Sequence, residues 1–280
     1  MSNIALRLAW RNLWRHKRRT WLTVGAMIFS NALLVFSMSL QFGSYDMMID
    51  NTLQAFSGHI QVQREGYLDD PKMRYTLDHI SSTAQLLRAE LELQSIGARA
   101  AGFALVSSDE RTYGLQILGV EPQFEALVST IPGLVKQGRY LREDSAAEIV
   151  IGSVLARNLK VELGDEITFL GSGLDDSFAA GVVKVVGIFE SGLPELDRSM
   201  AQVSLVYFQE AFAMQRRGHS IVIRARHIDQ VDELQQRIQT LLADRNQLAV
   251  LHWDQLQPGL KQVIQADMTS AWFMYMVLII

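Results

Sequence analysis

The stretch from Trp21 to Phe42 reads WLTVGAMIFSNALLVFSMSLQF and contains no charged residue over 22 positions. At 1.5 Å rise per residue, about 20 such residues cross the ~30 Å hydrocarbon core of a bilayer. A cleaved signal peptide is the alternative, but its apolar region is typically only about 7 to 15 residues long and ends at a small-x-small site. Ser37-Met38-Ser39 is a poor site of that kind. The stretch therefore predicts a retained transmembrane helix.

Basic residues precede this stretch, and acidic residues follow it. Six of the 26 Lys and Arg residues lie before position 45, where there is no acid, so the remaining 20 face all 30 acidic residues with a net charge of −10. By the positive-inside rule, the N-terminus is cytoplasmic and the bulk of the chain lies outside, in a periplasm or an extracellular space. The overall charge of −4 argues against a nucleic-acid partner.

The first 20 residues predict an amphipathic helix on the cytoplasmic leaflet that turns into the membrane near Thr20. Its basic residues recur at helical spacing, and its Trp residues fall on another side with Leu6 and Leu13. Contacts with lipid phosphates and headgroups are expected there. A purely topogenic role of the charges is the alternative. The membrane-surface residues are Arg7, Trp10, Arg11, Trp14, Arg15 and Arg18.

Apolar residues also dominate the other end of the sequence, where Met268 to Ile280 reads MTSAWFMYMVLII. Thirteen residues rise about 20 Å, which is too short to cross a bilayer. We therefore expect the start of a second transmembrane helix and treat the chain as part of a longer protein.

The region between the two spans alternates strand-like and helix-like stretches, which predicts a membrane protein of the α+β class with a large mixed α/β external domain. The expected order is a cytoplasmic helix (1–20), a transmembrane helix (21–42), a stalk (43–57), the external core (58–253), a return stalk (254–269) and the second span (270–280). Both spans would thus continue outward as stalks, which suits mechanical coupling.

No catalytic or metal-binding motif stands out. The absence of cysteine excludes thiol chemistry, and no HExxH pair or G-x-S-x-G elbow is present. Adjacent acids at Asp69-Asp70, Glu143-Asp144 and Asp175-Asp176 lie in loop-like sequence and are expected to be solvated turns. Transport, sensing or binding is therefore favoured over catalysis.

Several phrases occur in an order that resembles the MacB/FtsX-like permease family, and especially its lipoprotein-releasing, Lol-type branch. They include ALRLAWRNLWRHKRRT before the first span, SGHIQV after the stalk, LQILGVEPQ and IPGLVKQGRYL. The most diagnostic pair is IVIGSVLARNLKVELGD, from Ile149, and GIFESGLPELDRSMAQVSL, from Gly187. The resemblance covers essentially the whole chain.

This resemblance implies a non-catalytic permease subunit of a bacterial inner membrane ABC transporter, with a MacB-type periplasmic core domain. It implies dimerisation with a second permease subunit, identical or paralogous, and association with a cytoplasmic ATPase that binds ATP and Mg²⁺, so that no cofactor is expected in this chain. Lipoprotein or lipid would be the cargo, and a periplasmic carrier a further partner. The loop from Gly171 to Gly181 is shorter than the projecting hairpin of the carrier-binding Lol subunit, which argues against carrier docking by this loop.

Under this hypothesis, cargo meets the first helix where it leaves the membrane. The candidate contacts are Phe42, Met47, Met48, Ile49 and Leu53. Unbranched Met side chains suit variable acyl chains, and ordinary packing against the second helix is the alternative. Within the span, Ala26 and Ser30 form a small-xxx-small pair for close helix packing, and Asn31 should face a partner or cavity.

Two other classes of protein have to be weighed against the permease. A membrane-anchored ligand sensor with a cytoplasmic signalling module would have the same topology up to Ile280. A tethered periplasmic enzyme lacks a catalytic constellation in the sequence.

Overall fold

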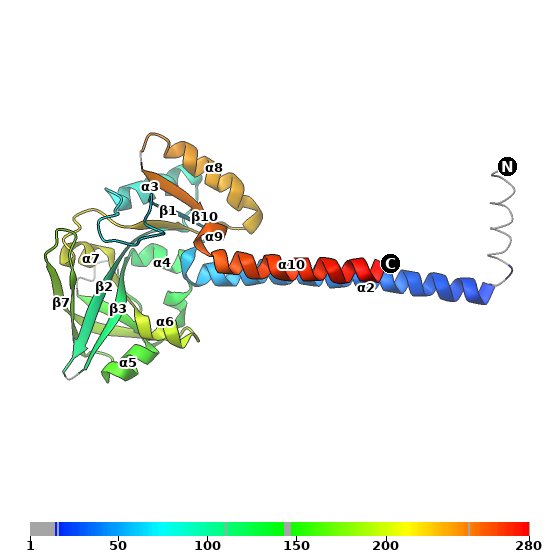
Figure 1. The fold of residues 1–280 in the computed structure, drawn as a ribbon. Coiled ribbons are helices and arrows are strands. Elements are labelled where there is room, and N and C mark those ends of the chain that lie inside the picture. Colours follow the sequence, from blue (N-terminus) through cyan, green and yellow to red (C-terminus); the bar gives the residue numbers. More distant parts are fainter. Residues whose placement is uncertain (1–14, 16, 110, 143–146, 246, 280) are drawn as a thin grey trace. The chain divides into compact units, whose positions relative to one another are not determined.

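The computed structural model describes residues 15, 17–109, 111–142, 147–245 and 247–279. It divides into two compact units (Figure 1). The first comprises residues 1–49 and 261–280 and holds most of two long helices, α2 (Lys17–Thr52) and α10 (Pro258–Ile279). The second, residues 50–260, is the mixed α/β domain.

In the first unit, α2 is helical from Lys17 onward and includes Thr20, so the described residues show no turn at Thr20 itself. A turn before Lys17 stays a prediction. Among the described residues, α2 from Lys17 to Ile49 is the one helix that is long and apolar enough to cross a membrane. Its apolar side chains are exposed along most of this length, as lipid-facing positions would be.

The second unit begins with the last residues of α2, and a single π-helical turn, η1 (Leu53–Ser57), follows directly. Gly58 ends this turn at φ +67°, and its N–H donates to the Leu53 carbonyl at 2.8 Å. A Cβ on Gly58 would lie 2.5 Å from Val222 Cγ1, so a side chain here would meet both a backbone strain and a steric clash.

The domain is organised around one ten-stranded mixed sheet with the order β10-β1-β9-β2-β3-β8-β5-β7-β4, in which β6 pairs with β2 and β7. The pairs β3–β8 and β5–β7 are parallel, and all others are antiparallel. The strands are β1 (Ile60–Arg64), β2 (Ile96–Ser108), β3 (Arg111–Val120), β4 (Val135–Gly138), β5 (Glu148–Gly152), β6 (Glu166–Ser172), β7 (Phe178–Phe189), β8 (Met200–Ser204), β9 (Ser220–Ile223) and β10 (Leu248–His252).

Short helices pack on this sheet. Helices α3 and α8 lie beside the strands at the β10 end, and α5, α6 and α7 lie beside the strands of the other half (Figure 1). The helices are α3 (Ile80–Leu91), α4 (Pro122–Val128), η2 (Ile131–Leu134), α5 (Ser153–Leu159), α6 (Pro194–Ser199), α7 (Leu205–Ala211), η3 (Ile228–Gln230), α8 (Val231–Leu241) and α9 (Trp253–Leu256).

Two hydrophobic clusters fill the domain. The larger cluster joins both halves, from Ile60 in β1 to Val183 in β7. The smaller cluster gathers around Leu118, Val150 and Phe189, and the side chain of Phe56 in η1 packs against it. The end of the stalk is therefore anchored in a hydrophobic core of the domain.

The sequence expectation for the loop after β6 needs a correction. Strand β6 extends to Ser172 and β7 starts at Phe178, with Gly171 paired to Ala179 and Ser172 to Phe178. The connection is therefore a tight turn of residues 173–177, and not a loop that reaches Gly181. The strands extend further because alternate residues of the added segments pack inward: Ala179 is fully buried while Phe178 is exposed.

Candidate functional site

A polar cluster joins α2 and α10 inside the first unit. The Gln41 side-chain oxygen accepts a hydrogen bond from the Tyr275 hydroxyl at 2.6 Å, and its nitrogen donates to the Tyr45 hydroxyl at 2.6 Å and to Asp267 Oδ2 at 3.2 Å. The Tyr45 hydroxyl donates to the same Asp267 oxygen. We call these four residues the helix-pair cluster.

Apolar packing accompanies the helix-pair cluster. On α10, the least exposed side chains are Ile264, Ala271 and Tyr275, and Met268 is half-buried between them. Spacings of three and four residues place these side chains on one face of the helix. The two helices form an antiparallel pair (Figure 1). The helix-pair cluster and an apolar face of α10 accompany this pairing.

The structure separates the candidate cargo residues into two groups. Phe42 and Met47 are 51% and 62% exposed, and Met48 is 37% exposed. Ile49 is 7% exposed and Leu53 is fully buried. A ligand outside the chain can therefore reach the first three side chains directly, whereas Ile49 and Leu53 have the burial of packing residues.

The residues chosen for helix packing are exposed in this chain. Ala26 and Ser30 lie on the open surface of α2. The Asn31 side chain, expected to face a partner or cavity, donates a hydrogen bond to the Met27 carbonyl of its own helix at 2.9 Å. This bond satisfies part of its polarity locally. Of the membrane-surface residues, Arg15 and Arg18 are helical and exposed, and Arg7, Trp10, Arg11 and Trp14 lie outside the described residues.

A buried ion pair lies where η1 enters the domain. Arg99 on β2 donates from Nε and Nη2 to the two oxygens of Glu125 on α4, at 3.0 and 2.6 Å, and neither side chain is more than 3% exposed. Arg99 Nη1 also donates to the Phe56 carbonyl in η1 at 2.6 Å, and the guanidinium lies 4.8 Å from the centre of the Phe56 ring. We call Phe56, Arg99 and Glu125 the junction clamp.

The junction clamp continues into the other half of the sheet. Gln202 on β8, fully buried, points its side-chain nitrogen at Glu125 Oε1 at 3.5 Å and accepts a hydrogen bond from the Tyr140 hydroxyl at 2.6 Å. Burial, with the nearby Glu125 charge, raises the pKa of Tyr140 well above its ordinary value, so that its hydroxyl remains a donor. Polar contacts thus link η1, β2, α4 and β8.

Sequence reasoning missed both the helix-pair cluster and the junction clamp. Arg99 and Glu125 are 26 positions apart, and Gln41 and Tyr275 are 234 apart, so no local periodicity connects them. The available signal was weak: an arginine inside the apolar run of β2, and an aspartate that directly precedes the second apolar segment.

The two most diagnostic phrases of the sequence meet in space. Asp197 on α6 is buried, and its carboxylate accepts hydrogen bonds from the Ser191 N–H at 2.9 Å and the Ser191 hydroxyl at 2.6 Å. It also accepts from the Ser153 hydroxyl at 3.3 Å. Gly152 approaches the Asp197 backbone so closely that a Cβ would lie 2.2 Å from its carbonyl oxygen.

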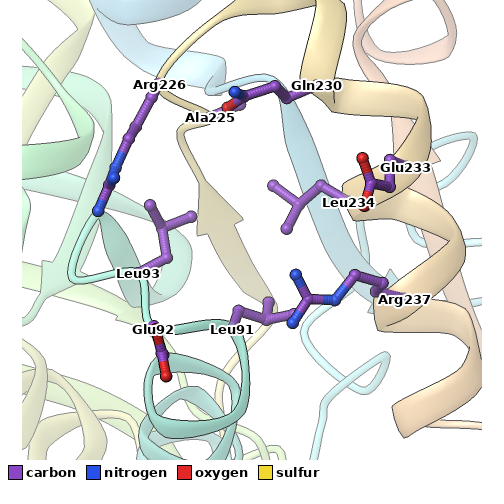
Figure 2. A pocket seen from close by; sticks show the side chains of 9 residues that line it. All are labelled: Leu91, Glu92, Leu93, Ala225, Arg226, Gln230, Glu233, Leu234 and Arg237. Atoms are coloured by element: carbon purple, nitrogen blue, oxygen red, sulfur yellow. The ribbon is translucent and has the colours of Figure 1, made fainter.

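A surface pocket of about 220 Å³ lies between the end of α3, the end of β9 and α8 (Figure 2). The Arg237 guanidinium points toward Leu91, and its Nη2 donates to the Glu90 carbonyl at 3.2 Å. The positive charges of Arg226 and Arg237 are matched by the negative charges of Glu92 and Glu233, so the charged residues of the lining favour neither an anion nor a cation. Its lining residues are Leu91, Glu92, Leu93, Ala225, Arg226, Gln230, Glu233, Leu234 and Arg237.

The described residues contain no group of three or more His, Asp or Glu side chains placed to hold a metal ion. Asp175 lies in the turn between β6 and β7, where hydrogen bonds from Ser177 lower the pKa of its carboxyl group. This is the solvated turn that the sequence predicted. The pair at 143–144 lies outside the described residues.

The comparisons with known proteins identify the family. Residues 20–241 match the family described as the MacB-like periplasmic core domain, which covers most of the chain. The chain therefore belongs to the MacB-like periplasmic core domain family, within the MacB/FtsX-like permeases related to LolE.

Individual relatives agree with this assignment. The chain is 24% identical over 187 residues to the lipoprotein-releasing system transmembrane protein LolE of Haemophilus influenzae, in an alignment that covers 63% of this chain and 44% of that protein. The fold is similar to the periplasmic region of MacB from Actinobacillus actinomycetemcomitans, with a TM-score of 0.53 and 16% identity over 77% of this chain and 96% of that one. It is also similar to the extracellular domain of the ABC-type transporter YknZ from Gram-positive bacteria, with a TM-score of 0.52 and 16% identity over 70% of this chain and 100% of that one.

Proposed function

We propose that this chain is the N-terminal part of a permease subunit of an ABC transporter in the bacterial inner membrane. A partner ATPase in the cytoplasm binds ATP and Mg²⁺ and hydrolyses the nucleotide. This chain pairs with a second permease subunit and converts the nucleotide cycle into movement of its periplasmic domain. Its N-terminus is cytoplasmic, and its first residues contact membrane lipids.

One observation carries this proposal: the chain enters and leaves a MacB-type domain through two helices that are paired with each other. α2 is apolar over the length of a membrane span, and α10 is hydrogen-bonded to it through the helix-pair cluster. A displacement of this pair in the membrane would therefore act on both ends of the domain. The family match does not favour the ligand sensor.

We further propose that the cargo is a lipoprotein or another acylated molecule taken from the outer leaflet of the inner membrane. LolE, which the chain resembles, is named for lipoprotein release. Exposed Phe42 ends the uncharged stretch, and exposed Met47 and Met48 follow it on α2, where an acyl chain leaving the membrane would meet the helix. A periplasmic carrier would receive the cargo at a surface other than the tight turn of residues 173–177.

Site-specific photo-crosslinking tests the cargo proposal. A photoreactive residue at position 42 or 48 of the complete transporter in its native membrane should crosslink to lipoproteins, detected by mass spectrometry. Position 178 is the matched control, because Phe178 is a large and exposed apolar residue (87%) on the domain. Equal lipoprotein yields at positions 42, 48 and 178, or none at 42 and 48 in an active transporter, would contradict the proposal.

A further inference from the structure

The end of the stalk is held by a side chain from the middle of the domain. The Phe56 carbonyl belongs to the single π-helical turn between α2 and β1, where the α-helical hydrogen-bond pattern is broken. Arg99 donates to this carbonyl at 2.6 Å, although the two residues are 43 positions apart. This bond reaches η1 from β2, a strand that pairs with β3, β6 and β9.

Glu125 gives this contact a fixed geometry. The carboxylate accepts two parallel hydrogen bonds from Arg99, which orients the planar guanidinium and directs Nη1 toward Phe56. Burial of both charges is costly, and apolar residues of similar volume would often stabilise a fold equally well or better. A fully buried pair that also holds the stalk is therefore expected to have a role beyond stability.

We propose that the junction clamp is a positioning device that makes η1 move with the core of the domain. Arg99 acts through the Phe56 carbonyl and ring, and Glu125 acts through Arg99. This inference rests on the proposed function, since it names the residues through which motion of α2 would reach the domain. Loss of the clamp should leave the domain folded and loosen the last turn before β1.

The chain supplies a matched control pair. Arg88 on α3 pairs with Glu121, its Nε donates to the Ile96 carbonyl at 2.8 Å, and its guanidinium lies 3.3 Å from the centre of the Phe124 ring. Like the clamp, this pair combines a largely buried Arg–Glu ion pair with a backbone carbonyl and an aromatic ring, and Glu121 Oε2 also accepts from the Ala98 N–H at 3.1 Å. It bonds β2 instead of η1.

The first experiment is hydrogen exchange of the full-length protein without nucleotide. The double variant Arg99→Met/Glu125→Leu removes both charges, so no lone ion stays buried. The peptide covering residues 53–60, which includes the Gly58 N–H bonded to Leu53, should exchange about tenfold or more faster, because local opening is easier. Peptides from β3 should stay as protected as in the wild type.

The control variant Arg88→Met/Glu121→Leu should leave exchange of residues 53–60 unchanged. If Arg99→Met/Glu125→Leu does not fold, Arg99→Lys is the second variant. Lysine keeps the ion pair but cannot make the two parallel hydrogen bonds of the guanidinium, so the exchange rate of residues 53–60 should rise severalfold. The proposal would be overturned if residues 53–60 kept their wild-type protection from exchange in every folded clamp variant. It would also be overturned if Arg88→Met/Glu121→Leu lost as much protection of residues 53–60 as the clamp variant does.

The second experiment repeats the exchange in the complete transporter with its ATPase, without nucleotide and with ATP and vanadate. The wild type and the control variant should show nucleotide-dependent exchange in the domain, and the clamp variant should lose it while ATP hydrolysis continues. A clamp variant with loosened η1 and a wild-type nucleotide response would overturn the positioning role. No nucleotide response in the wild type would refute the proposed function instead, while the first experiment still decides whether Arg99 holds η1.

Discussion

The contact between Gly152 and Asp197 allows a sharp prediction for the variant Gly152→Ala. Gly152 has φ −75°, so alanine adopts this backbone without strain, and the effect comes from contact alone. The new Cβ would lie 2.2, 2.5 and 2.6 Å from the carbonyl oxygen, Cα and carbonyl carbon of Asp197. These are backbone atoms, so α6 has to shift and the hydrogen bonds of Asp197 to Ser191 and Ser153 are distorted.

The size of the effect follows from the rigidity of this contact. Overpacking costs about 1–3 kcal/mol, and a clash with backbone belongs at the upper end, about 3 kcal/mol. For a domain of about 150–250 residues, each kcal/mol lowers the Tm by about 2–4 °C, so we expect a decrease of about 6–12 °C. The decrease in Tm is measured by heating the detergent-solubilised chain and determining the unfolded fraction of the domain at each temperature by pulse proteolysis.

Gly133→Ala is the matched control, because no atom lies within 4 Å of the Cβ that would be added there. It should change the free energy of unfolding by no more than about 0.5 kcal/mol. If Gly152→Ala and Gly133→Ala unfolded at the same temperature, the close packing of β5 on α6 would be refuted.

Three further predictions concern other parts of the molecule. His219 is buried, and its Nδ1 accepts a hydrogen bond from the Ala101 N–H. Burial lowers the pKa of His219 from 6.5 to about 4, so the unfolded chain binds a proton at a higher pH than the folded chain does. The free energy of unfolding should therefore fall by about 3 kcal/mol as the pH drops from 6.5 to 4. His219→Gln should remove this part of the pH dependence in urea titrations, and an unchanged slope would contradict the assignment. Asp267→Asn should weaken the helix-pair cluster by about 0.6–1 kcal/mol. Spin labels on α2 and α10 should then show that the ratio of separated to paired helices rises about three- to fivefold. An unchanged distance distribution would show that the charge of Asp267 is dispensable for the pairing. Leu53→Ala should cost about 2–5 kcal/mol, because the side chain is fully buried, and a cost below about 1 kcal/mol would place it outside the core.

Much of the fold could be predicted because its elements are locally encoded. The uncharged stretch 21–42 lies within α2 (Lys17–Thr52), and the apolar segment that starts at Met268 lies within α10 as far as Ile279. Charge-free runs and the alternation of strand-like and helix-like stretches are visible in the sequence without knowledge of the fold. The sequence signal is weak for strand β4, which has only four residues, and for helix α6, whose buried member is the charged Asp197.

The candidate site was less predictable, because it depends on burial and on distant partners. The end of the uncharged stretch placed Phe42, Met48 and Leu53 where the first helix leaves the membrane, but the sequence does not show which side chains a domain covers, and Leu53 is fully buried. Arg99 is a single basic residue in an apolar strand, and only the fold reveals that it meets Glu125 and the Phe56 carbonyl.

We propose that ATP hydrolysis on the cytoplasmic side of the membrane drives the release of an acylated cargo on the periplasmic side. The most direct measurement uses proteoliposomes that contain the complete permease, its ATPase and a fluorescent triacylated lipoprotein, with a periplasmic carrier outside. We predict that, when ATP is added, the fluorescent lipoprotein appears in the soluble fraction bound to the carrier. A non-hydrolysable ATP analogue should produce no such release. ATP hydrolysis at an undiminished rate with all lipoprotein retained in the liposomes would contradict the account.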